Sequence, residues 1–253
     1  MAGLSLQITQ PGLDGPVAVP IASVRQTVEC TGSGNDAAVC LLTAVRVQIP
    51  YELAATSTAV LKDGIVAPVA ALTVLEEDRP SRSFQIQPIS VNGHVITSCD
   101  PTWDTTLEAV CTRTAYHANG SPVNADGPAA RGETISIFAY GLGQTSPPAV
   151  TGAPASVSAS LDPPQSVRIN FEALSNAPSW LPRHDDPAPY NLPPVTPRFA
   201  GLSAGQVGVY QIDITIPMDV KVELRCTSDY GPNLVIMVTT PPGTETVPVC
   251  VGS

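Results

Sequence analysis

The chain has 253 residues, of which 43% are hydrophobic and only 13% charged, and its formal net charge is −10 at pH 7. This hydrophobic share is enough to build real cores, whereas the charged share is about half of the usual value. No cluster of Lys or Arg is present, which argues against binding to nucleic acids or to anionic membranes. No run of about 18 apolar residues occurs either, so no membrane-spanning helix is predicted.

Short apolar and alternating segments, separated by Pro, Gly and Asn, predict β-strands along the whole chain. The predicted strands lie at residues 5–9, 21–29, 41–49, 57–61, 69–74, 84–87, 94–97, 107–116, 133–140, 166–171, 208–216, 221–226, 234–238 and 246–251. The best helical candidate is short, at residues 50–56. Asp-Gly at 63–64 and Asn-Gly at 92–93 and 119–120 predict hairpin turns, because both central positions tolerate a positive φ.

One strand plan occurs twice. Residues 5–9 (SLQIT) lead to an alternating strand at 44–50, and residues 166–170 (SVRIN) lead to an alternating strand at 210–217. Both alternating strands end in proline, and each is followed by a further strand, a turn and another strand. Internal repetition of this kind indicates two copies of one β-module.

The two copies differ at their beginning. The second copy has an opening strand at 133–140, and the first copy has no counterpart in the sequence before residue 5. A sandwich without one strand exposes unpaired backbone groups. We therefore expect the middle block, residues 82–119, or a strand from another chain to fill the gap; strand addition repeated head to tail would build a filament.

These features predict an all-β fold of two immunoglobulin-like antiparallel β-sandwich modules joined by a β-rich middle segment. The expected boundaries are residues 1–80 for the first module, 81–127 for a β-hairpin connecting segment and 128–253 for the second module. Two long irregular loops are expected in the second module, at 143–165 and at the proline-rich insert 175–198. Loops of this length are usually functional or disordered.

Six cysteines form three pairs of neighbours along the sequence. Their even number, together with the scarcity of lysine (Lys62 and Lys221 only), favours an oxidising compartment and an extracellular or cell-surface location. Six cysteines allow 15 pairings, and buried free thiols are the alternative. The pairing that we favour is local: Cys30–Cys40, Cys99–Cys111 and Cys226–Cys250. No signal peptide is visible, so we expect either expression without a leader or excision from a longer protein.

Three ordered blocks carry a resemblance to a known family. They are residues 128–147 (PAARGETISIFAYGLGQTSP), residues 47–53 (VQIPYEL) and residues 200–217 (AGLSAGQVGVYQIDITIP). Through them the chain resembles the Solibacter-type uncharacterised C-terminal domain of large secreted bacterial proteins, over roughly residues 40–253. The resemblance implies immunoglobulin-like β-modules and an extracellular setting, but no established activity. The insert at 175–198, the segment 10–40 and the cysteines depart from the family pattern.

No catalytic constellation is visible. None of the three histidines lies in a known catalytic motif, and we expect His94 and His117 to be ordinary surface residues near turns. Gly141-Leu142-Gly143 lacks the helix and lysine of a phosphate loop. The chain is therefore predicted not to be an enzyme, and no catalytic residue, cofactor or metal is assigned.

Two groups of residues are candidates for ligand binding. His184, Asp185 and Asp186 are adjacent, and a loop that wrapped around a divalent ion would bring them together, although a solvated acidic loop is the simpler interpretation. Aromatic loop residues stack on sugar rings in carbohydrate-binding modules, although such residues also cap cores. The candidates of this second kind are Trp103, Trp180, Tyr116 and Tyr190.

The acidic run Glu76-Glu77-Asp78 is interpreted as a solvated linker at a module boundary. The sequence as a whole favours an extracellular structural or adhesive protein, with strand sharing between copies or with other surface proteins as its mode of assembly. The alternative is a carbohydrate-binding module that uses the 175–198 loop. Protein partners or glycans are thus expected, and nucleic acids and membrane insertion are not.

Overall fold

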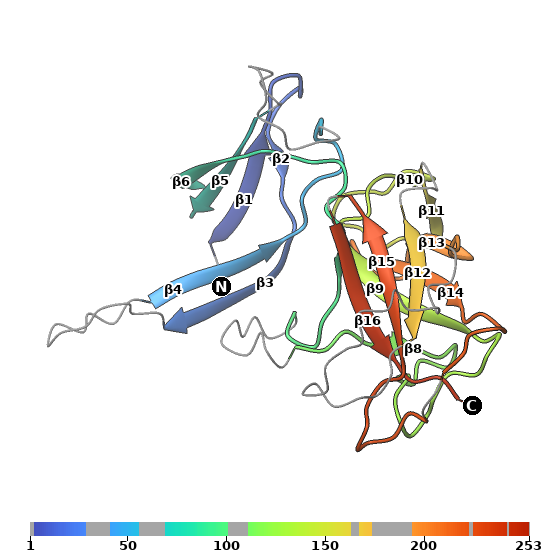
Figure 1. Cartoon of the computed structure of the whole chain (residues 1–253). Helices are drawn as coiled ribbons and strands as arrows, with labels where there is room; N and C mark the ends of the chain where they lie inside the picture. Colours follow the sequence, from blue (N-terminus) through green and yellow to red (C-terminus); the bar gives the residue numbers. More distant parts are fainter. Residues whose placement is uncertain are drawn as a thin grey trace, which may run out of the picture. The chain divides into compact units, whose positions relative to one another are not determined.

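The computed structural model describes residues 3–28, 41–55, 69–100, 111–162, 167–173, 194–222, 225–241 and 243–252. In these residues all regular secondary structure is β-strand, and every pair of strands is antiparallel, which confirms the predicted all-β fold (Figure 1). The chain divides into two compact units. The first unit contains Met1–Ile89 with Val150–Ala153, and the second contains Ser90–Ala149 with Pro154–Ser253.

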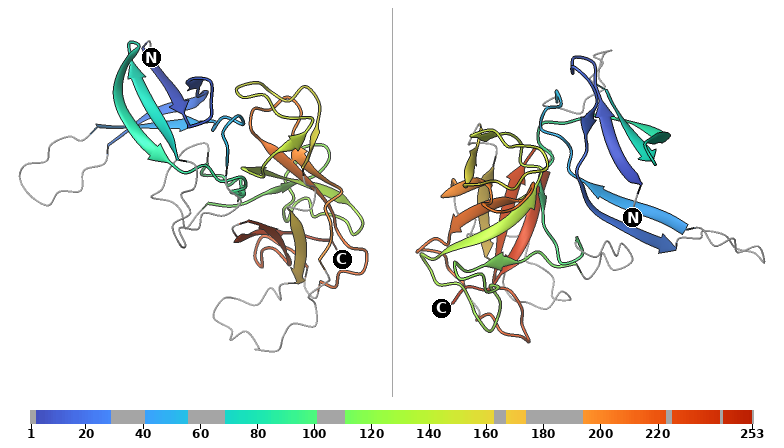
Figure 2. Two further views of the ribbon diagram at one scale, coloured as in Figure 1. Left: turned by 90° about the horizontal axis from the view of Figure 1, so that it is seen from above. Right: turned by 180° about the vertical axis from the view of Figure 1, so that it is seen from behind.

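The first unit has two sheets. Its strands are β1 (Leu4–Thr9), β2 (Val17–Ala18), β3 (Ile21–Val28), β4 (Leu41–Val47), β5 (Ala70–Glu76) and β6 (Arg79–Ile86). One sheet has the order β2-β1-β5-β6, and the other consists of β3 and β4, which run side by side (Figure 2). Alternation in β1 buries Leu6 and Ile8, which lie on one face because side chains of a strand alternate.

The core of the first unit is small. Its fully enclosed apolar residues among those described are Leu6, Ile8, Val19, Leu53 and Ala70. Other apolar side chains of the same cluster are only partly buried; they include Val45, Val47, Leu72, Val74 and Ile86. Buried apolar area stabilises a fold by about 25 cal/mol per Å², so this unit gains less from its side chains than a closed sandwich would.

The second unit is a two-layer β-sandwich. Its strands are β7 (His94–Val95), β8 (Ala115–Tyr116), β9 (Thr134–Tyr140), β10 (Thr145–Ser146), β11 (Ala159–Leu161), β12 (Arg168–Ala173), β13 (Phe199–Leu202), β14 (Tyr210–Thr215), β15 (Leu234–Thr240) and β16 (Gly243–Val249). One layer has the order β10-β11-β13-β14-β9-β7, with β8 also paired to β9, and the other has the order β12-β15-β16.

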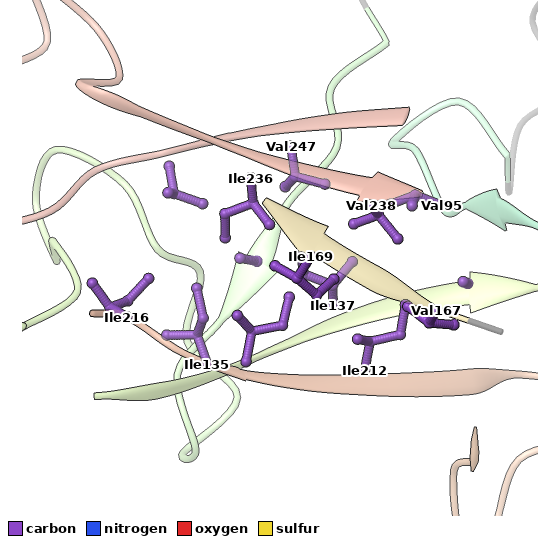
Figure 3. Close-up of a cluster of buried hydrophobic side chains, with 14 of the residues drawn as sticks. Val95, Ile135, Ile137, Val167, Ile169, Ile212, Ile216, Ile236, Val238 and Val247 are labelled. Atoms are coloured by element: carbon purple, nitrogen blue, oxygen red, sulfur yellow. The ribbon is translucent and has the colours of Figure 1, made fainter. Parts of the chain in front are cut away.

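Branched apolar side chains from both layers meet in the core of the second unit (Figure 3). Ile135 and Ile137 come from β9 and Ile212 from β14, whereas Ile169 and Ile236 come from the facing layer, and all five are fully buried. The strict alternation TISIFAY in β9 and YQIDIT in β14 places these residues on one face. The second unit therefore has a more extensive core than the described part of the first unit.

The pairing scheme of the first unit recurs in the second. The order β1-β5-β6 corresponds to β12-β15-β16, and the pair β3-β4 corresponds to β13-β14. The correspondence extends to single residues: Ile8 pairs with Val17 just before β3, and Ile169 pairs with Val195 just before β13. The repeated strand plan in the sequence is thus matched by repeated strand pairing. An immunoglobulin-like arrangement of the two units stays a prediction.

The segment 81–127, expected to be a separate connector, is divided between the units. Strand β6 begins at Arg79 and pairs with β5 in the first unit, whereas β7 and β8 pair with β9 in the second. The acidic run is not a linker between modules: Glu77 and Asp78, at φ 48° and 62°, form the two-residue turn of the β5–β6 hairpin. Such a turn needs positive φ at both central positions, which these residues supply without glycine.

Four other local predictions need correction. Residues 50–55 form turns and not a helix, and the described residues of 221–226 form no strand. The 143–165 segment contains β10 and β11 instead of being wholly irregular. Gly93 lies against Thr240, where a Cβ would come within 2.3 Å of the hydroxyl oxygen, so close approach and not a turn requires glycine there. The turn predicted at 63–64 and the strand predicted at 57–61 lie outside the described residues.

Candidate functional site

Among the described residues strand β4 has one neighbouring strand, whereas its counterpart in the second unit has two. In the second unit β14 lies between β13 and β9, and it pairs with β9 from Tyr210↔Ala139 to Thr215↔Thr134. In the part of the chain that the structure describes, β4 pairs with β3 and with no other strand. The described residues of the first unit thus contain no counterpart of β9 beside β4.

Backbone donors point towards this edge. The amide of Gln48 donates to the carbonyl of Pro20 at 2.9 Å, on the β3 side. Because amides along an antiparallel strand point alternately to its two sides, those of Val45, Val47 and Ile49 point to the opposite side. In the second unit the residue equivalent to Ile49 is Ile216. Its amide donates to the carbonyl of Glu133, just before β9, at 2.8 Å.

Side chains along β4 are less buried than their counterparts. Ile49 and Ile216 each precede the proline that ends the alternating strand, yet Ile49 is 45% exposed and Ile216 is 0% exposed. Val45 and Val47 are half-buried, whereas Ile212 and Ile214 are fully buried. The face of β4 that corresponds to the buried face of β14 is therefore partly exposed.

One polar atom near this edge also lacks a partner. The side-chain oxygen of Gln48 accepts a hydrogen bond from the amide of Gly152 at 2.7 Å, but its Nε2 is buried without a hydrogen-bond partner among the described residues. In the second unit the equivalent residue is Thr215, whose hydroxyl lies 3.1 Å from that of Thr134 on β9. A buried donor without an acceptor is costly, so this position favours a neighbouring strand.

Strand β1 does not have the open edge. Its residues Leu4–Thr9 pair with β5 along their whole length, and Gln7 and Ile8 also pair with Ala18 and Val17 of β2. Both neighbours of β1 therefore belong to the first unit, and the part of the middle block at residues 82–86 lies in β6, beside β5 and not beside β1. In the described part of the chain, the strand that lacks a neighbour equivalent to β9 is β4, a location that the sequence comparison did not identify.

Two of the three predicted disulfides are present. Cys99–Cys111 and Cys226–Cys250 have Cα atoms 5.3 and 5.4 Å apart and close local loops, as predicted from their spacing. Cys30 and Cys40 lie outside the described residues. Disulfides persist in oxidising compartments, and these two are compatible with an extracellular protein.

A polar cluster in the second unit surrounds His94. Its ring nitrogens lie 3.3 Å from Glu245 and 3.1 Å from Asp100, and Arg113 pairs with Glu245 at 2.8 Å. Burial raises the pKa of Asp100, but hydrogen bonds from the Thr97 amide and hydroxyl and from His94 outweigh it and hold that pKa below its ordinary value. The cluster joins β7 to β16 next to the Cys99–Cys111 disulfide.

His117 is not an ordinary surface histidine, contrary to expectation. Its side chain is 17% exposed; its Nδ1 lies 2.5 Å from Glu133 and its Nε2 lies 2.9 Å from the carbonyl of Gly127. The hydrogen bond to Glu133 and then that to Gly127 raise the pKa of His117, whereas burial lowers it. Burial raises the pKa of Glu133, but hydrogen bonds from His117 and the Ala130 amide lower it below its ordinary value. The ion pair holds the 117–127 loop to the start of β9.

The residues singled out for ligand binding are mostly outside the described part of the chain. These are Trp103, Trp180, His184, Asp185, Asp186 and Tyr190. Tyr116 is described, and its ring packs against Phe138 of β9 with centroids 5.7 Å apart, which is a structural contact. In the described residues no group of three or more His, Cys, Asp or Glu side chains is placed to hold a metal ion. Glycan binding by the 175–198 loop therefore stays a prediction.

Comparisons with known proteins give no further assignment: no family model, curated protein or solved structure matches the chain. No described helix has the length and apolar character needed to cross a membrane.

Proposed function

We propose that this protein is an extracellular structural or adhesive β-protein that assembles with other protein chains by sharing a strand. The observation that carries the proposal is the difference between β4 and β14. Two units have the same pairing scheme, and the described part of one of them lacks the strand that closes the other. Strand addition at such an edge is an established mode of protein recognition, in which main-chain hydrogen bonds give affinity and alternate side chains give specificity.

The extracellular location is supported by chemistry. Two disulfides lie within the second unit, and lysine is nearly absent from the chain. The resemblance of three sequence blocks to a domain of secreted bacterial proteins agrees with this location. The low share of charged residues, 13%, also suits a scaffold better than a binder of charged ligands.

Sharing a strand between different surfaces of successive copies is a head-to-tail contact. Such contacts make rings when the rotation closes and filaments when it does not. The proposal therefore has two forms. In the first, the protein is a self-assembling surface subunit, which would change its sedimentation and its appearance in the electron microscope most. In the second, it adheres to a different surface protein.

Sedimentation velocity and negative-stain electron microscopy of the oxidised protein, over a range of concentrations, test the proposal. We expect concentration-dependent oligomers, or stable complexes with proteins extracted from the same cell surface. A protein that stays monomeric at every concentration and binds no surface protein would contradict it.

A further inference from the structure

We infer that the edge of β4 accepts, from a neighbouring polypeptide chain, an extended segment with the apolar pattern of β9. The inference rests on the proposed function and specifies its partner by chemistry. The second unit is the template, since it shows which strand covers the equivalent face and in which register.

The pattern of the donor follows from β9. Ile135, Ile137 and Ala139 occupy alternate positions of that strand and are all 0% exposed, so they fill the core between the two layers. The residues between them are half-buried on the other face, where Phe138 packs against Tyr116 of β8. A donor for β4 therefore needs branched or small apolar residues at three alternate positions, and the positions between them tolerate polar residues.

The register also follows from β9. Ile135 pairs with Ile214 and Ile137 pairs with Ile212, while Thr134 pairs with Thr215. This register can be transferred to the first unit by aligning the prolines that end the two alternating strands. The donor residues equivalent to Ile135 and Ile137 then lie opposite Val47 and Val45. The donor residue equivalent to Thr134 lies opposite Gln48, whose Nε2 lacks an acceptor among the described residues.

Ile49, just after β4, is the residue whose side chain would gain the most burial when a donor binds. The equivalent Ile216 exchanges hydrogen bonds with the segment just before β9: its amide donates to Glu133 and its carbonyl accepts from Gly132, both at 2.8 Å. A donor that runs past Ile49 in the same way would cover an isoleucine that is now 45% exposed. Burial of this side chain is then coupled to donor binding.

The donor is separate from β9 itself. That strand pairs with β14 on one side and with β7 and β8 on the other, so within one chain it is already fully used. Supplying it to another copy would open the second unit, and this domain swap is one outcome that the experiment distinguishes.

The test uses the full-length oxidised protein and a synthetic peptide with the sequence of residues 131–141 (RGETISIFAYG), followed by hydrogen exchange. We expect the peptide to slow exchange at Val45, Val47 and Ile49 by at least about tenfold. A peptide of the same composition, permuted to destroy the alternation, should leave exchange unchanged. Slowed exchange in β14 or β9 instead of β4 would reveal domain swapping and overturn the inference.

Two variants make the test specific. Ile49→Lys places a charge where the donor must bury an apolar side chain, and we expect it to weaken peptide binding by at least about tenfold. Val207→Lys is the matched control, because Val207 is 43% exposed in the second unit, and it should bind the peptide like the parent. Equal binding by parent and Ile49→Lys, or slow exchange at β4 before any peptide is added, would overturn the inference.

The outcomes separate this inference from the proposed function. Peptide binding by a protein that stays monomeric and binds no surface protein would uphold the acceptor edge and contradict assembly. Assembly that excess peptide does not inhibit would uphold strand sharing or adhesion and contradict the β4 edge as its site.

Discussion

Equivalent isoleucines in the two units have very different surroundings: Ile216 is fully buried and Ile49 is nearly half exposed. The units pair their strands in the same order, so local sequence is not the cause. Among the described residues β4 has no neighbour equivalent to β9, which pairs with β14 and contributes Ile135, Ile137 and Ala139 to the core, and β3 has none equivalent to β11. A sandwich buries its inner faces only when both layers are wide enough to cover each other.

The largest expected effect comes from truncating these two isoleucines. Ile216→Ala removes a fully buried side chain and should destabilise the second unit by about 2–5 kcal/mol. Ile49→Ala, at the equivalent position, should cost less than about 1 kcal/mol in the first unit, since the side chain is already exposed to water. Urea unfolding read by hydrogen exchange in peptides from each unit measures both values, and equal losses would mean that Ile49 is enclosed.

Removing the Cys226–Cys250 disulfide by replacing both residues with alanine is expected to cost about 3 kcal/mol. The disulfide closes a loop of 24 residues inside the second unit, so peptides from that unit should lose protection first. Peptides from the first unit serve as the internal control and should be unaffected. An equal loss in both units would show that they unfold together.

A pair of buried amides offers the next contrast. Asn233 bonds the backbone of Val251 in both directions, at 2.8 and 2.9 Å, and Gln10 bonds the backbone of Ala54 in the same way, at 2.7 and 2.8 Å. Val251 is buried but Ala54 is exposed, so water can replace only the second partner. Asn233→Ala should cost about 2 kcal/mol and Gln10→Ala less than about 1 kcal/mol. Chemical denaturation measures both, and the reverse order would contradict this account.

The smallest effect is a pH dependence of the second unit. The pKa of His117 lies above 6.5 in the folded protein, so its stabilisation is complete below pH 6.5 and is lost as the pH rises through the raised value. The pKa of Glu133 lies below 4.5, so its stabilisation is present above pH 4.5 and is lost as the pH falls through the lowered value.

The ion pair should therefore contribute most between pH 4.5 and 6.5, by about 1 kcal/mol. Denaturation midpoints of the parent and of Glu133→Gln, measured from acid to alkaline pH, test this prediction. Their difference should be largest within that interval. A difference that does not vary with pH would show that the pair is not ionised there.

Much of the scaffold is predictable from the sequence, for identifiable reasons. Strands such as β9, β14 and β15 alternate strictly and bury one face, so period-2 patterning identifies them. The local disulfides follow from cysteine spacing. Ile8 and Ile169 occupy the same position in the two similar segments SLQIT and SVRIN, which indicates that the two segments pair in the same way.

What sequence could not predict are features fixed by tertiary contacts. Strand β6 is exposed along nearly its whole length and carries no apolar alternation, so only its pairing with β5 defines it. Glu77 and Asp78 form a turn usually occupied by Asn-Gly, which disguises the hairpin as a charged linker. The position of the candidate site was not predicted: the repeat indicates that the first copy has no counterpart of residues 133–140, but only sheet order shows that, among the described residues, this leaves one side of β4 unpaired.

Residue-resolved hydrogen exchange of the dilute, monomeric protein tests the central claim most directly. We expect the amides of Val45 and Val47 in β4 to exchange much faster than those of Ile212 and Ile214 in β14, although the two strands occupy equivalent positions in their repeats. Fast exchange confined to the edge away from β3 would establish an open acceptor strand. Protection of Val45 and Val47 equal to that of Ile212 and Ile214 would contradict it.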